Sequence, residues 1–235
     1  MTPLPPATAG LPANADPMAQ VERFPALDAT GVCLSAFIKR IPGIDVAHDK
    51  AEALRRLDAV HREVRRSLGM GEWPLLTVEQ VHGNEIAIVD LAKNGDEHFS
   101  GCDGFITNQR GLALGIQVAD CCAVYLVDPI SPAIGLVHSG KKGTELNIVG
   151  KAIAQMIARF GSNPANMIVQ LSPCIRPPHY EIDFAAQVRE QAKSLGVKQI
   201  HDSGVCTACD LRAYYSYRAE KGKTGRMLAL LGLLR

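Results

Sequence analysis

Six short β-like segments crowd the stretch between residues 75 and 137, and this crowding restricts the fold more than any other feature of the sequence. The segments are Leu75–Val78, Glu85–Val89, Gly104–Thr107, Leu112–Val118, Ala123–Val127 and Ala133–Val137. Turn-forming residues such as Gly83-Asn84 and Asp128-Pro129 separate them. Two parallel strands need a crossover of about a dozen residues or more, which is usually a helix. These spacings are too short for one between every pair, so many pairs are expected to be antiparallel.

Helical periodicity flanks this β-rich stretch. Apolar residues spaced for one helix face predict helices at His48–Leu68, Thr144–Phe160 and Phe184–Leu195. Further strands are expected at Val32–Lys39, Met167–Leu171 and Leu228–Leu233. Such a pattern is typical of the α+β class, with helices packed against a sheet system.

The composition indicates one globular domain. The chain has 235 residues, of which 47% are hydrophobic and 21% charged. We interpret residues 1–20 as a flexible lead-in and 21–235 as a single domain.

A net charge of +1 gives no reason to expect nucleic acid or a membrane as partner. The chain shows neither a signal peptide nor a membrane-spanning stretch. Seven cysteines in a chain without an export signal then predict free thiols and a cytoplasmic location. We expect a monomer or a small homo-oligomer.

Three side chains able to bind a metal follow apolar strands. His82 lies in Glu79–Gly83, Cys121 in Ala119–Cys122, and His138 in Val137–Gly140. Two histidines and a thiolate match a catalytic zinc site, which has three protein ligands and one open position. The spacing alone leaves the alternatives open, because a lone histidine is often a hydrogen-bonded structural residue and a cysteine a small buried hydrophobe.

Several motifs occur in an order that resembles the YfiH-like family, often called multicopper polyphenol oxidoreductases or laccase-domain proteins. These motifs are Gln80–Gly83, Cys102–Thr107, Val118–Cys121, Val137–Gly140, Ser172–Ile175, Tyr180-Glu181, Tyr215–Arg218 and Thr224–Arg226. The resemblance extends from about Val32 to the C-terminus. It implies an α/β sandwich with mixed, largely antiparallel sheets and flanking helices.

The resemblance also implies a function. The residues matching the family's metal ligands are His82, Cys121 and His138, which would hold Zn²⁺. The implied activity is phosphorolysis of adenosine, inosine, guanosine or methylthioadenosine, and in some members deamination of adenosine. Copper and phenol oxidation fit less well, because one His₂Cys set cannot build several copper centres.

Other residues are candidates for roles in this chemistry. Phosphate needs cationic donors, and those in family-like segments are Arg40, Lys142, Arg218 and Arg226. For deamination, Asp120 and Glu79 are the carboxyl groups nearest in sequence to the metal ligands, and Asp120 is equally suited to orienting a ligand. Cys122, Cys174, Cys206, Cys209, His48, His61, His98, His179 and His201 are interpreted as structural or surface residues. Cys206 and Cys209 have the Cys-x-x-Cys spacing, but no second pair completes a four-ligand site.

The sequence departs from the family pattern near His138. The family usually has His-Ala-Gly-Trp-Arg-Gly where this chain has Ser139, Lys141 and Lys142. The change removes an aromatic surface and the bidentate geometry of an arginine. Ser172 replaces a usual glycine, and 39–43 matches the usual segment only loosely. These changes leave two alternatives open: a catalytically impaired metal-binding relative, or a metal-free hydrolase or deamidase in which Cys121 is the nucleophile and a histidine the base.

Overall fold

The computed structural model describes residues 16–91 and 94–235, and two six-stranded sheets form its centre. The first sheet has the order β1 (Val21–Glu22), β2 (Cys33–Ile38), β12 (Met227–Leu233), β7 (Ala113–Val118), β3 (Leu75–Val78), β5 (Glu97–Phe99). The second has the order β11 (Gln199–Asp202), β10 (Ile168–Leu171), β8 (Cys122–Asp128), β9 (Ala133–Ser139), β6 (Gly104–Thr107), β4 (Ile86–Val89). Both sheets mix parallel and antiparallel pairs, and antiparallel pairs predominate. The expected α+β sandwich with mixed, largely antiparallel sheets is confirmed.

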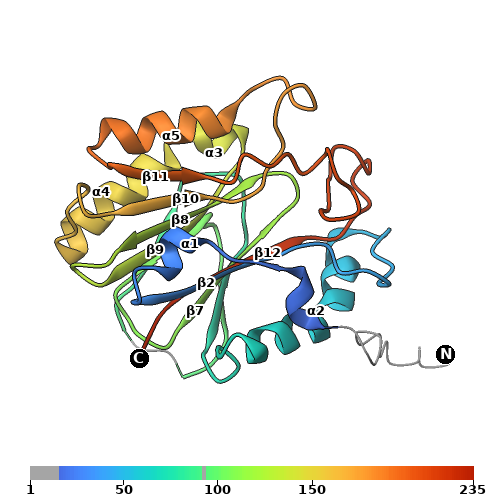
Figure 1. Cartoon of the computed structure of the whole chain (residues 1–235), viewed down its shortest axis with the longest axis horizontal. Helices are drawn as coiled ribbons and strands as arrows, with labels where there is room; N and C mark the ends of the chain where they lie inside the picture. Colours follow the sequence, from blue (N-terminus) through green and yellow to red (C-terminus); the bar gives the residue numbers. More distant parts are fainter. Residues whose placement is uncertain (1–15, 92–93) are drawn as a thin grey trace.

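Helices cover the two sheets from opposite sides. The helical elements are η1 (Pro17–Gln20), α1 (Pro25–Asp28), α2 (Lys50–Ser67), α3 (Lys141–Glu145), α4 (Ile148–Phe160) and α5 (Phe184–Ser194). Figure 1 shows α4 and α5 on one side of the strands and α2 on the other. The apolar face of α2, with Leu57, Val60 and Val64, joins the core of the first sheet.

Strands β8 and β9 are buried along their whole length, and they are apolar except at Asp128, His138 and Ser139. In β8, Ala123, Tyr125 and Val127 point into the core between the sheets. Their neighbours Cys122, Val124 and Leu126 point into a second core beneath α4 and α5. Successive side chains of a strand face opposite ways, so a strand between two cores carries an unbroken apolar run. This central position holds the ends of β8 and β9 rigidly.

The structure corrects one predicted helix. The continuous helix expected at Thr144–Phe160 is instead α3 and α4, separated at Asn147. Asn147 has a left-handed backbone (φ 55°), and its side chain accepts a hydrogen bond from Gly150 N–H as the N-cap of α4. An asparagine before an apolar periodic run is a helix-start signal that could have located this break.

Sequence reasoning missed three edge strands, β1, β5 and β11, of which β1 has only two residues. β5 has three residues and β11 alternates exposed with half-buried positions, so neither has the apolar run that marks the central strands. Of the lead-in expected at 1–20, residues 1–15 lie outside the described residues. Pro17–Gln20 form the 3₁₀ turn η1, which Asp16 caps by accepting from Met18 N–H.

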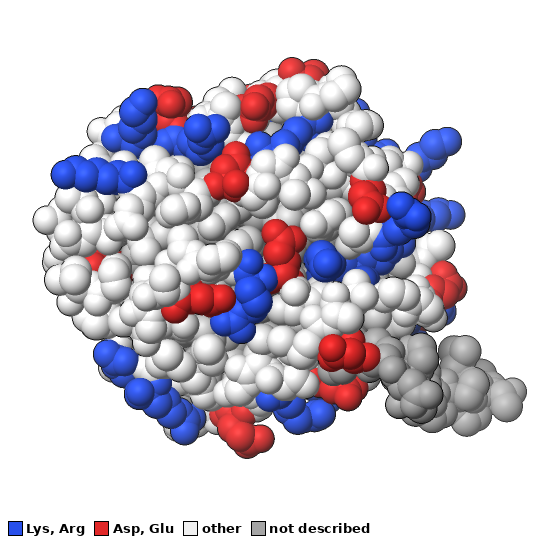
Figure 2. Space-filling view, in the orientation of Figure 1, with Lys and Arg blue, Asp and Glu red and all other residues white. Residues whose placement is uncertain are grey.

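Charge is finely mixed on the surface. On the face shown in Figure 2, lysine and arginine side chains lie among aspartates and glutamates. This face therefore offers no extended field of one sign. Within residues 16–91 and 94–235, no helix has both the length and the apolar character needed to cross a bilayer.

His61 on α2 gives the fold a dependence on pH. It is buried, its Nε2 has no hydrogen-bond partner among the described residues, and burial lowers its pKa from 6.5 to about 4. The unfolded chain therefore binds this proton first, and stability is lost as pH falls from 6.5 towards 4. The loss corresponds to about 3 kcal/mol of unfolding free energy.

Between pH 6.5 and pH 4, we expect the unfolding free energy of the His61→Leu variant to fall by about 3 kcal/mol less than that of the wild type. Urea unfolding at pH 6.5 and pH 4 measures the difference, with the exposed His201→Ala variant as the control. Equal pH dependence in the wild type and His61→Leu would contradict this assignment.

Candidate metal centre

His82, Cys121 and His138 come together although far apart in the sequence. Their ligand atoms all lie within 4.8 Å of one another. His138 is near the end of β9, Cys121 joins β7 to β8, and His82 follows β3. The two imidazole rings meet edge to face, with 4.9 Å between centroids. His138 is buried, Cys121 half-buried and His82 exposed, so the group is open on the His82 side.

Asp103, immediately before β6, holds both histidines. Its buried carboxylate accepts from His138 Nδ1 at 2.9 Å, from His82 N–H at 2.9 Å and from Gly83 N–H at 2.7 Å. Because Nδ1 of His138 is occupied, Nε2 is the nitrogen available to a metal. A carboxylate behind a ligating histidine fixes its tautomer and orientation and raises its basicity.

The backbone around the group is adapted to close approach. The backbones of His82 and Gln80 are left-handed (φ 61° and 64°), a conformation that residues other than glycine rarely adopt. Asp103 holds His82, and Gln80 exchanges two hydrogen bonds with the backbone of Gln117. A Cβ added at Gly140 would lie 2.5 Å from Cys121 Sγ, so glycine there leaves room for the thiol. Such conformations, maintained by surrounding contacts, concentrate at functional sites.

The charges of the three residues support one another. Burial opposes ionisation of the Cys121 thiol, but the positive charge of His138 and hydrogen bonds from both histidines outweigh it and lower the Cys121 pKa to about 6. Burial likewise opposes protonation of His138, yet Cys121 and Asp103 raise the His138 pKa to about 9. The group thus readily supplies a thiolate, the form of cysteine that binds metals.

A cavity of about 950 Å³ opens above these residues. Its wall includes His82, Cys121 and His138, the aromatic side chains Tyr180, Phe184 and Tyr217, and the cations Lys50, Lys141, Lys142, Arg218, Lys221 and Arg226. The volume is typical of small-molecule sites. Lys142, Arg218 and Arg226, expected from the sequence as anion-binding residues, therefore lie together in one cavity.

Two cations of the wall repel each other. Burial lowers the Lys50 pKa, and the nearby charge of Arg226 lowers it further. Arg226 is itself buried, and its Nη1 donates to the carbonyls of Thr224 and Gly225, which fixes the guanidinium. An anion between these cations would relieve their repulsion.

Asp120 lies on the cavity wall and uses both of its carboxylate oxygens for hydrogen bonds within the protein. Oδ1 accepts from Thr207 Oγ1 at 2.7 Å, and Oδ2 accepts from Arg218 N–H at 2.8 Å. These bonds connect the end of β7 to the loop before β12. Glu79, the other carboxyl candidate, is exposed, and its Oε2 accepts from Gly101 N–H.

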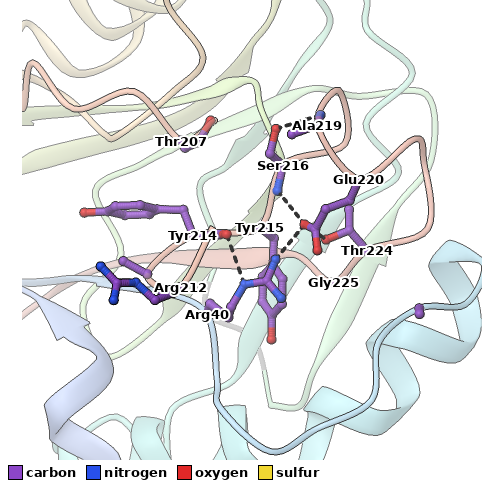
Figure 3. A network of polar contacts seen from close by, with 12 residues as sticks. Arg40, Thr207, Arg212, Tyr214, Tyr215, Ser216, Ala219, Glu220, Thr224 and Gly225 are labelled. Atoms are coloured by element: carbon purple, nitrogen blue, oxygen red, sulfur yellow. Dashed lines mark hydrogen bonds and ion pairs between the residues drawn. The ribbon is translucent and has the colours of Figure 1, made fainter. Parts of the chain in front are cut away.

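Arg40 belongs to a separate polar network, shown in Figure 3. It donates to Glu220 at 2.6 Å and to the Tyr214 carbonyl at 3.0 Å, and it lies over the Tyr215 ring at 4.3 Å. Glu220 also accepts from Ser216 N–H and Thr224 Oγ1, so the network braces the loop that carries Arg218 and Arg226. Arg40 is not among the residues of the cavity wall.

The donor set suits a single ion. Two imidazoles and a thiolate, with an open side towards a cavity, match a three-ligand site that keeps one position for water or substrate. A multicopper centre needs several histidine pairs, and the described part of the chain gathers only two histidines here. Fold and site together define an α+β protein with one Cys–His₂ centre at the base of a cation-rich cavity.

Comparison with known proteins agrees with this description. Residues 43–187 and 178–234 match the family described as multi-copper polyphenol oxidoreductase laccase. A protein of Streptomyces coelicolor named purine nucleoside phosphorylase is 30% identical over 72% of this chain and 78% of its own length. YlmD of Geobacillus stearothermophilus, with the same enzyme name, is 30% identical over 75% of this chain and 79% of its own.

Solved structures share the fold. The crystal structure of YlmD from Geobacillus stearothermophilus superposes with a TM-score of 0.76 over 94% of both chains at 22% identity. A hypothetical protein YfiH of Bacillus licheniformis gives 0.75 over 86% of this chain and 93% of its own at 23% identity. The chain belongs to the multi-copper polyphenol oxidoreductase laccase family, whose curated relatives are named purine nucleoside phosphorylases.

Sequence reasoning overlooked two residues of this centre. Asp103 lies in the Cys102–Thr107 motif but has no spacing that links it to His138, 35 positions away. Lys50 is the first residue of α2, where it looks like one more charge on an amphipathic helix. The Cys102–Thr107 motif can be seen in the sequence, and within it a carboxylate directly before an apolar strand is the signal that could have indicated a role for Asp103.

Proposed function

We propose that this protein is a zinc-dependent purine nucleoside phosphorylase acting on adenosine, inosine, guanosine or methylthioadenosine. The observation that carries the proposal is the cavity itself, which has a Cys–His₂ donor set at its base and several cations on its wall. The name purine nucleoside phosphorylase, which relatives 30% identical to this chain carry, supports a purine nucleoside as the substrate.

The cations of the wall would hold the phosphate. In phosphorolysis a phosphate oxygen forms a bond to C1′ of the ribose while the C1′–N9 bond breaks, and its electron pair leaves with the purine, which takes up a proton. Arg226 and Lys50 would bind the attacking phosphate, because both are partly desolvated and their mutual repulsion favours an anion. Lys142 and Arg218 lie on the same wall and would complete the site.

The aromatic residues would hold the base. Tyr180 lies under the guanidinium of Arg218 at 4.9 Å and meets Phe184 edge to face at 5.9 Å, so its ring is fixed at the cavity wall. Tyr217 is 54% exposed at the same wall and lies near Arg226. In this chain these tyrosines would supply the aromatic surface that Lys141 does not.

Zinc would be held by His82, Cys121 and His138. When bound, it supplies a Lewis acid and lowers the pKa of a water in its open position. Asp103 would keep His138 and His82 aligned. Asp120 would act as a positioning residue, because its carboxylate fastens the Arg218 backbone and Thr207. Deamination of adenosine, in which water adds at C6 and ammonia leaves, would use the same site.

The ligands of the centre favour zinc over copper. A blue-copper site uses the same His₂Cys set with a weak axial methionine, and no methionine is among the described residues of the cavity wall. Elemental analysis of the purified protein and its electron paramagnetic resonance spectrum distinguish the two metals.

The direct assay is the release of base from inosine with and without phosphate. We expect hypoxanthine and ribose 1-phosphate only when phosphate is present, and Lys50→Ala or Arg226→Ala is expected to raise the phosphate KM about 10- to 100-fold. That change corresponds to one lost hydrogen bond to a charged group, worth about 1.5–3 kcal/mol. Chromatography of the products and initial rates measure both effects.

Arg40→Ala serves as the comparison, because its guanidinium is engaged by Glu220. We expect it to lower stability and to raise the phosphate KM less than Lys50→Ala or Arg226→Ala does, because Arg40 reaches the phosphate site only through the loop that it braces. Base release at the same rate without phosphate would show that the enzyme hydrolyses nucleosides and does not phosphorolyse them. If no nucleoside is turned over, the protein is a metal-binding member of the family that lacks this activity.

A further inference from the structure

A second cluster of soft ligands lies outside the cavity. Among the described residues, His179, Cys206 and Cys209 have ligand atoms within 4.8 Å of one another, and neither the proposed chemistry nor the family motifs use them. His179 lies on the segment after β10, and the two cysteines lie on the loop between β11 and β12. The Cys-x-x-Cys pair therefore has a third ligand that is distant in sequence.

The distances fit a metal better than hydrogen bonds. Nδ1 of His179 is 3.7 Å from Cys206 Sγ and 3.5 Å from Cys209 Sγ. Zinc bond lengths of about 2.3 Å to sulfur and 2.0–2.1 Å to nitrogen, at tetrahedral angles, place sulfur and nitrogen about 3.6 Å apart. A neutral imidazole nitrogen has one proton or one lone pair, so hydrogen bonding explains one of these contacts but not both.

The backbone holds the cluster in place without help from a metal. Cys206 pairs with Cys174 in a parallel β-bridge, and Cys209 N–H donates to the Cys206 carbonyl at 3.1 Å in a tight turn. Arg176 forms an ion pair with Asp202 and donates to the Val205 carbonyl at 3.4 Å, which ties the two segments together. His179 and Cys209 are exposed, so a metal and a fourth, water ligand can reach the site.

The cluster adjoins the cavity wall on both of its segments. His179 precedes Tyr180, whose ring lies on the wall. Thr207, between the two cysteines, donates to Asp120. A metal there would fasten the segment carrying Tyr180 to the loop carrying Thr207.

We propose that His179, Cys206 and Cys209 form a second metal site, selective for a thiolate-preferring divalent ion such as Zn²⁺. The site is structural: it holds two segments of the cavity wall together and takes no part in the reaction. It is independent of the proposed function, and its test uses no nucleoside.

The test uses Co²⁺ as a spectroscopic probe in the Cys121→Ser variant. Among the described residues of the cavity wall, Cys121 is the only cysteine, so in this variant a thiolate-to-cobalt charge-transfer band must come from another site. We expect one equivalent of Co²⁺ to bind with that band and with tetrahedral d–d absorption, and Zn²⁺ to displace it. Adding Cys209→Ser or His179→Ala should weaken binding about 100-fold or more, because each removes a direct ligand. Adding His201→Ala, another exposed histidine, should change nothing.

A second measurement tests the structural role. Zn²⁺ added to Cys121→Ser should slow amide hydrogen exchange in residues 176–181 and 205–210, and it should not do so once Cys209→Ser is added. The absence of a thiolate-to-cobalt band in Cys121→Ser overturns the site, as does a Cys206–Cys209 disulfide that persists under reducing conditions. Binding without any change in exchange overturns the structural role.

Discussion

The Cys121→Ser variant is expected to lose one equivalent of metal per chain and to release purine base about 10³-fold more slowly than the wild type. Cys121 supplies the only thiolate among the described ligands of the cavity centre, and its pKa is already lowered by the two histidines. Lewis-acid stabilisation amounts to several kcal/mol, and each 1.4 kcal/mol changes the rate tenfold. Elemental analysis and the rate of base release from inosine measure the two losses.

Cys122→Ser is the matched control. Cys122 is the next residue in the chain, but its side chain points into the core beneath α4, where its Sγ contacts the Ser172 carbonyl. This variant should keep its metal content and its kcat, with some loss of stability. A chelator should abolish wild-type activity, and Zn²⁺ should restore it. Activity that survives metal removal but not Cys121→Ser would instead make Cys121 a nucleophile with a histidine base.

The Asp103→Asn variant is expected to bind zinc at the cavity centre 10- to 100-fold more weakly and to lose activity in parallel. An asparagine has one acceptor oxygen and one amide donor in place of the carboxylate that accepts from His138, His82 and Gly83. At least one donor then loses its partner, and His138 loses the charge that makes it a strong ligand. Competition titration with a chromogenic chelator measures the affinity.

Asp128→Asn separates the local effect from a general loss of stability. Asp128 is as deeply buried as Asp103 and likewise accepts three hydrogen bonds, all of them from backbone N–H groups, those of Ile130, Ser131 and Asn163. It lies at the opposite end of β8 from Cys121. We expect both variants to lower the unfolding free energy by about 1–3 kcal/mol, and only Asp103→Asn to weaken metal binding. Equal metal affinity in the two variants would contradict the role of Asp103.

Most central elements could be predicted from the sequence because burial leaves a periodic signal. The strands at β3 and β6 and the two amphipathic helices α2 and α5 match their predicted positions to within two residues at each end. The edge strands β5 and β11 left no such signal, because an edge exposed to solvent needs no apolar run. The break between α3 and α4 falls at Asn147, directly before the apolar stripe of α4, and the five-residue α3 carries no apolar stripe of its own that would mark it as a separate helix.

The sequence by itself determined the ligand types, the strand ends that carry them and the family motifs around His82, Cys121 and His138. Only the tertiary structure decided which side chains lie together in one site. It placed Asp103 behind both histidines, put Lys50 beside Arg226, and joined Arg40 to Glu220 outside the cavity wall. It also brought His179 to a Cys-x-x-Cys pair that has no partner nearby in the chain. Spacing along the chain reports only local periodicity, whereas these contacts depend on how the two sheets bring distant loops together.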